Sequence, residues 1–120
     1  MTSPVLNSQI TDQIIVPHPV TMDLYRKMLT VFYIEERMKA FVRQGKCGFQ
    51  ASTRGHEKLQ IGMTLLLKPG HDWFFPYYRS KALAVGLGMP IKDIFLGMLG
   101  REGDPNSNGR NMPEQWSSRK

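Results

Sequence analysis

The feature that most constrains the fold is an apolar stripe within residues 21–44. Apolar side chains recur there at the spacing of one helix face, which predicts a single helix of about six turns. Thr21 can cap the start of this helix, Asp23 suits its first turn, and Gly45 stops it. The stripe consists of Leu24, Met28, Val31, Phe32, Met38 and Phe41.

Shorter helices are expected further along the chain. Ser52 or Thr53 would cap a second helix over roughly residues 55–67, and a third is expected over residues 78–85. Pro90 suits the first position of a fourth helix, where its missing N–H has no partner to lose.

Two short pieces have the pattern of strands. One lies around Phe49, and the other is the apolar run Trp73-Phe74-Phe75, which we interpret as a brief buried strand ended by Pro76. From Arg101 onward the chain is rich in Gly, Asn and Ser, without a periodic pattern. The predicted fold class is therefore mainly α with one or two short strands.

Length and composition limit the class of protein. A chain of 120 residues is at most one domain, and we divide it into an arm over residues 1–20 and a domain over residues 21–120. No apolar run approaches the roughly 20 residues that cross a bilayer, so we expect no membrane segment. The first twenty residues contain no Lys or Arg, which argues against a secretory signal or a mitochondrial presequence and predicts a cytoplasmic protein.

The net charge of +6 raises the question of a nucleic-acid partner. The basic residues are interleaved with acids, as in Glu35-Glu36-Arg37, which is typical of solvated helix faces. Because no charged stripe is present, we expect no nucleic acid to bind. The single cysteine, Cys47, excludes an internal disulfide and a multi-cysteine metal site.

The strongest candidate for chemistry is Tyr77-Tyr78-Arg79-Ser80, at the expected start of the third helix. A helix start favours an anion through its free N–H groups, and Arg79 adds a planar fork that matches phosphate oxygens. The Tyr77 and Tyr78 hydroxyls can each donate a hydrogen bond, so the set predicts a diphosphate clamp. The alternative is that both tyrosines are core aromatics and that Arg79 pairs with a local acid.

A second candidate is the pair His56-Glu57, which could act as acid and base. Adjacent positions of a helix do not face each other, so Glu57 is more simply a partner of the helix dipole. The three histidines, His18, His56 and His71, are too scattered for a metal site of recognisable spacing.

The order of motifs along the chain resembles a known family. A long helix with Glu35-Glu36-Arg37 leads into Gln44-Gly45-Lys46-Cys47-Gly48-Phe49, Gly55-His56-Glu57, Tyr78-Arg79, Gly86-Leu87-Gly88 and Gly109-Arg110-Asn111-Met112-Pro113. This ordered set, from about Thr21 to the last residue, resembles the alpha subunit of the first component of thiamine-diphosphate-dependent 2-oxo acid dehydrogenase complexes.

The resemblance implies a fold, a cofactor and partners. The segment would be an N-terminal fragment of an α/β thiamine-diphosphate-binding fold, with Tyr78 and Arg79 contacting the cofactor diphosphate and Tyr77 beside them. The family's magnesium ligands and the glutamate that activates the thiamine ring are expected outside this chain. The implied partners are a beta subunit or a fused equivalent, a lipoyl acyltransferase component and a 2-oxo acid substrate.

The implied reaction is oxidative decarboxylation with acyl transfer to lipoyl, and the isolated chain is expected to be inactive. Met112-Pro113 resembles the branched-chain group of the family. Ala51, where pyruvate-type members often place a histidine, agrees with that group. The alternative function is a non-catalytic, truncated interaction module that docks on a partner subunit.

Overall fold

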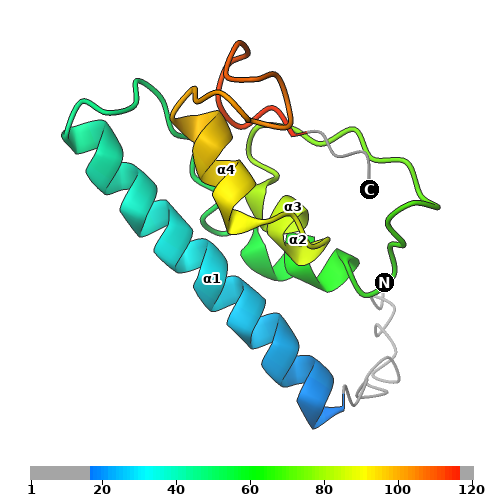
Figure 1. The fold of residues 1–120 in the computed structure, drawn as a ribbon. Coiled ribbons are helices and arrows are strands. Elements are labelled where there is room, and N and C mark those ends of the chain that lie inside the picture. The colour runs from blue at the N-terminus through cyan, green and yellow to red at the C-terminus, as the bar shows by residue number, and fades with distance from the viewer. Residues whose placement is uncertain (1–16, 117–120) are drawn as a thin grey trace, which may run out of the picture.

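The computed structural model describes residues 17–116, and four helices make up its regular structure (Figure 1). The long first helix runs along one side of the molecule, and the three short helices lie together beside it. The mainly helical class predicted from the sequence is confirmed. The helices are α1 (His18–Arg43), α2 (Glu57–Met63), α3 (Lys81–Gly86) and α4 (Ile91–Met98).

Neither of the expected short strands forms within residues 17–116. The prediction of a buried strand at residues 73–75 was wrong, because Trp73 and Phe75 are 89% and 95% exposed. A strand needs a neighbouring strand to complete its hydrogen bonds. No segment of the described part pairs with residues 73–75 or with the piece around Phe49.

The ends of α1 follow from local backbone chemistry. The helix begins three residues before Thr21, directly after Pro17. Thr21 is therefore not the cap, and its hydroxyl donates instead to the Pro17 carbonyl at 3.3 Å, one turn back. At the other end Gly45 adopts φ +67°, and the Lys46 N–H returns to the Phe41 carbonyl at 2.9 Å, which ends the helix where predicted.

The next two helices are shorter than expected. α2 stops four residues early, and α3 starts three residues late. Ser52 and Thr53, expected as caps of α2, donate their hydroxyls to Glu35 instead. α4 agrees with its prediction, except that Pro90 lies just before its first residue.

The helices share one apolar core. α1, α2 and α3 contact one another, and α4 joins them through two buried residues and an edge-to-face contact between Phe41 and Phe95. At Gly86 of α3 the approach is so close that an added Cβ would lie 2.6 Å from Thr64 Cγ2, just after α2. The buried core consists of Val31, Ile34, Met38, Cys47, Ile61, Ala82, Val85, Ile94 and Met98.

The loop over residues 101–116 has no helix or strand, but it is fixed by Asp104. The Asp104 carboxylate accepts from the backbone N–H groups of Asn106, Ser107 and Gly109 at 3.1–3.2 Å. Burial raises the pKa of Asp104, but these hydrogen bonds outweigh it and hold the pKa below its usual value. The loop thereby reaches back and brings Glu114 into the interior.

The predicted arm lies mostly outside the described residues. Its last three residues, 18–20, belong to α1, and residues 1–16 are not described. Within residues 17–116 no helix is both long enough and apolar enough to cross a membrane.

Candidate functional site

A buried lysine joins three separate segments of the chain. The Lys81 side chain is fully buried. Its ammonium lies 2.6 Å from Glu114 Oε1, 3.0 Å from the Ala51 carbonyl oxygen and 3.5 Å from Glu35 Oε1. Three acceptor oxygens therefore lie within 3.5 Å of the ammonium, which has three N–H groups to donate. A buried charge is tolerated only when it is paired and hydrogen-bonded. Because Lys81 belongs to α3, Glu35 to α1 and Glu114 to the C-terminal loop, these contacts tie the three segments together.

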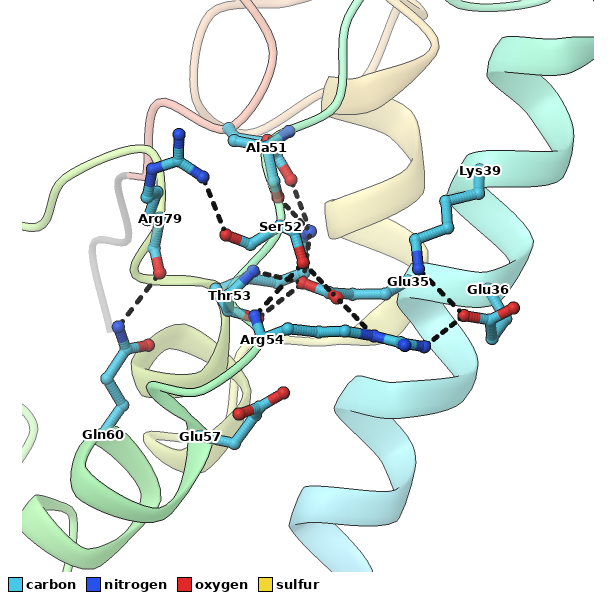
Figure 2. A network of polar contacts seen from close by, with 12 residues as sticks. Glu35, Glu36, Lys39, Ala51, Ser52, Thr53, Arg54, Glu57, Gln60 and Arg79 are labelled. Atoms are coloured by element: carbon cyan, nitrogen blue, oxygen red, sulfur yellow. Dashed lines mark hydrogen bonds and ion pairs between the residues drawn. The ribbon is translucent and has the colours of Figure 1, made fainter.

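Glu35 is the acidic partner on α1, and it points toward residues 51–54 (Figure 2). Its Oε1 accepts from the Thr53 backbone N–H at 2.5 Å and from the Thr53 hydroxyl at 2.6 Å, and its Oε2 accepts from the Ser52 hydroxyl at 2.9 Å. Burial raises the pKa of Glu35, but the Thr53 hydrogen bonds and the Lys81 charge outweigh it and hold the pKa below its usual value. Glu35 is therefore ionised at neutral pH and fixes residues 51–54.

Glu114 is the second acidic partner. Its Oε2 accepts from the Ala51 N–H at 2.6 Å, while its Oε1 faces the Lys81 ammonium. Burial raises the pKa of Glu114 above its usual value, although Lys81 and the Ala51 N–H act in the opposite direction. Both backbone polar groups of Ala51 are thus held by this ion pair, the N–H by Glu114 and the carbonyl by Lys81.

The predicted clamp residues lie together in the turn before α3. The ring centroids of Tyr77 and Tyr78 are 3.8 Å apart, and the Arg79 guanidinium carbon lies 5.3 Å from the Tyr78 centroid. A hydrogen bond between the two phenols lowers the pKa of Tyr78 and raises the pKa of Tyr77. The set lies directly before α3, with Ser80 as the N-cap, rather than in the first turn of the helix as expected, because α3 begins only at Lys81.

Arg79 is held by the Ser52 carbonyl and the Gln60 side-chain amide rather than by an acid. Its Nη1 donates to the Ser52 carbonyl at 3.1 Å, and its own carbonyl accepts from Gln60 Nε2 at 3.0 Å, as Figure 2 shows. Within the described residues it forms no ion pair, in contrast to the alternative of a local acid. Tyr77 is 58% exposed and is not a core aromatic. The guanidinium and the phenol of Tyr77 therefore lie where an anion can reach them.

The other predicted candidates do not converge. Glu57 Oε2 accepts from the Gly55 N–H at 2.7 Å, and His56 is exposed, so the two do not form an acid–base pair. His71 lies 3.2 Å from Asp72 in an exposed turn. In the part of the chain that the structure describes, no three His, Cys, Asp or Glu side chains come together as a metal site.

Sequence reasoning missed the cluster of Lys81, Glu35 and Glu114. Only Glu35 carries a recognisable signal, because it falls on the apolar stripe, four residues after Val31 and three before Met38. A charged residue at such a position has to be buried with a partner. Glu114 lies in a loop without periodicity, so no sequence pattern indicates its burial.

Comparison with known proteins identifies the family. The family model for the dehydrogenase E1 component matches residues 25–120. The chain is 37% identical, over 82% of its length, to 2-oxoisovalerate dehydrogenase subunit alpha of Bacillus subtilis (strain 168). It is 33% identical over 78% of its length to the protein of the same name from Pseudomonas aeruginosa. It is 32% identical over 77% of its length to pyruvate dehydrogenase E1 component subunit alpha of Bacillus cereus. The chain spans 30%, 22% and 23% of the lengths of these relatives. It belongs to the dehydrogenase E1 component family.

Proposed function

We propose that this chain is part of the alpha subunit of a thiamine-diphosphate-dependent 2-oxo acid dehydrogenase, and that Arg79 and Tyr78 hold the cofactor diphosphate with Tyr77 beside them. The observation that carries the proposal is the arrangement of the turn before α3. An arginine without an acidic partner in the described residues lies over the ring of Tyr78, which in turn contacts the ring of Tyr77.

The donor set fits a diphosphate. A guanidinium offers five N–H groups in a plane, and the structure uses Nη1 for the Ser52 carbonyl. The remaining fork and the phenol hydroxyls suit phosphate oxygens. When bound, thiamine diphosphate supplies the carbanion chemistry of 2-oxo acid decarboxylation. The chain's own residues bind and orient the diphosphate. The magnesium implied by the family would need ligands other than residues 17–116, where no such cluster forms.

The partners we propose are those implied by the family. They are a beta subunit or a fused equivalent, a lipoyl acyltransferase component and a 2-oxo acid. A branched 2-oxo acid is favoured by Met112-Pro113 and by the names of two relatives, which are 2-oxoisovalerate dehydrogenase alpha subunits.

The decisive experiment is Arg79→Ala in the complete alpha subunit that carries this segment, assembled with its beta subunit. We expect thiamine diphosphate, titrated with magnesium in a calorimeter, to bind about 1.5–3 kcal/mol more weakly, which is the range for hydrogen bonds to charged groups. Tyr78→Phe should cost less because it removes one neutral donor. Arg101→Ala, which removes an exposed arginine of the C-terminal loop, is the matched control. Unchanged affinity in Arg79→Ala would remove Arg79 from the proposed diphosphate clamp.

Substrate preference is a separate test of the branched-chain assignment. In the same assembled enzyme we expect a higher kcat/KM for branched 2-oxo acids than for pyruvate, measured with each substrate under the same conditions. A clear preference for pyruvate would show that Met112-Pro113 does not track specificity.

A further inference from the structure

We propose that the buried Lys81–Glu114 ion pair positions the Tyr77–Arg79 turn for the diphosphate. This role rests on the function proposed above for Arg79 and deepens it. Lys81 does not itself contact the ligand, because its ammonium is fully buried and faces three acceptors of the chain.

Hydrogen bonds through Ala51 and Ser52 connect the ion pair to the Arg79 guanidinium. Glu114 and Lys81 hold the N–H and the carbonyl of Ala51 at 2.6 Å and 3.0 Å. The carbonyl of the next residue, Ser52, accepts from Arg79 Nη1 at 3.1 Å. The Ser52 carbonyl lies between Ala51, which the ion pair holds, and the Thr53 N–H, which Glu35 holds at 2.5 Å. The ion pair therefore acts together with Glu35 to orient the carbonyl that accepts from Arg79.

The second line of support comes from the other end of the turn. The indole Nε1 of Trp116, two residues after Glu114, donates to the Tyr77 carbonyl at 3.1 Å. The segment 114–116 therefore bridges two places: Ala51 through the Glu114 carboxylate, and the tyrosine turn through Trp116. If the ion pair releases Glu114, both attachments weaken together.

The chain carries its own reporter for this bridge. It has two tryptophans, and Trp73 is 89% exposed, so Trp73→Phe leaves Trp116 as the sole tryptophan. In that background Lys81→Met with Glu114→Gln removes the two opposite charges of the pair together. Glu35 loses Lys81 in this variant but keeps the Thr53 and Ser52 hydrogen bonds and the Arg54 Nε contact at 3.9 Å. We expect unchanged helical circular dichroism, a red-shifted Trp116 emission and indole N–H exchange at least tenfold faster. The control Lys27→Met with Asp23→Asn removes an exposed ion pair of α1 and should leave Trp116 unchanged.

Measuring cofactor affinity then distinguishes a positioning role of the ion pair from a general effect on the stability of the fold. In the complete enzyme, the double variant should bind thiamine diphosphate with magnesium three- to tenfold more weakly. Adding Arg79→Ala to it should cause no loss beyond that of Arg79→Ala alone, because the ion pair acts through Arg79. Additive losses, or an unchanged Trp116 signal, would overturn the positioning role. An Arg79→Ala variant with full affinity would instead remove the proposed function, and the positioning role with it.

If the double variant loses its helical signal, Glu114→Gln alone takes its place in both measurements. It keeps an oxygen that can accept from the Ala51 N–H but removes the charge that faces Lys81. The expected and contradicting outcomes are the same.

Discussion

At the scale of single residues, the decisive feature is a carboxylate in the middle of an apolar helix face. Glu35 is fully buried beside Val31, Ile34 and Met38. An isolated charge there would cost several kcal/mol. Donors from Thr53 and Ser52 and the Lys81 ammonium offset that cost. At this turn of α1, directed polar contacts therefore take the place of apolar packing.

Glu35 should govern the acid sensitivity of the chain. Its folded pKa lies below the ordinary value of 4.5, so the stability that it contributes is complete above pH 4.5 and is lost as the pH falls through the folded pKa. We predict that Glu35→Gln makes the decline of unfolding free energy at acid pH shallower. It should also lower stability at neutral pH by about 3 kcal/mol, because Lys81 loses a charged partner. Urea unfolding over a series of pH values measures both effects.

Glu114 provides a control of opposite sign. Its folded pKa is raised, so its contribution is present below pH 4.5 and is lost as the pH rises through the folded pKa. Glu114→Gln should therefore make the acid decline steeper. Asp104, whose pKa is lowered, keeps some acid sensitivity in both variants. Parallel pH profiles for the parent and Glu35→Gln would contradict the role of Glu35.

At the scale of secondary-structure elements, the α2–α3 contact depends on one glycine. An added Cβ at Gly86 would lie 2.6 Å from Thr64 Cγ2 and 3.2 Å from Ile61 Cδ1. We predict that Gly86→Ala lowers the free energy of unfolding by about 1–3 kcal/mol, because overpacking forces neighbouring groups apart. Chemical denaturation monitored by circular dichroism measures the change.

Gly62 of α2 is the matched control for Gly86. It is also helical, but an added Cβ there would meet no atom within 4 Å. Gly62→Ala should raise stability by about 0.5–1 kcal/mol through the lower entropy of the unfolded chain. Equal effects of the two substitutions would show that α2 and α3 do not pack as closely as described.

At the scale of the whole molecule, large apolar side chains remain exposed. Leu66, Trp73 and Phe75 are 82%, 89% and 95% exposed, and they cluster in the segment between α2 and α3. Several such residues close together in sequence are unusual for a monomer and favour association. We predict that the sedimentation profile of the purified chain shifts to larger species with increasing concentration. Trp73→Ser together with Phe75→Ser should suppress the shift. A monomer at all concentrations would contradict this.

The 120-residue chain alone should bind thiamine diphosphate poorly and release no carbon dioxide from 2-oxo acids. If Arg79 and the tyrosines bind the diphosphate as proposed, they would do so without a metal site among the described residues. Exposed ion pairing of this kind contributes about 1 kcal/mol or less. The assay uses excess cofactor and magnesium with the purified chain, and a denatured sample gives the background. Turnover above that background would show that the chain needs no further metal ligands or proton relay.

The sequence by itself determined α1, α4 and the family. The apolar stripe of α1, the glycine at its end and the proline before α4 act through local spacing and backbone limits, which is why these elements were predicted correctly. The ordered motifs likewise identify the family from the sequence alone, because recognising them requires no knowledge of contacts between distant segments. Tyr77, Tyr78 and Arg79 lie together in one turn because they are adjacent in the chain.

Only the tertiary structure decided which charged side chains pair with one another. Glu35, Lys81 and Glu114 are far apart in sequence, and their pairing depends on how α1, α3 and the C-terminal loop pack. The same packing places the Ser52 and Thr53 hydroxyls against Glu35, so neither residue caps α2 as predicted. The strand expected at residues 73–75 failed for a related reason. A strand is stable only with a partner, and partnership is a property of the assembled structure rather than of a local sequence.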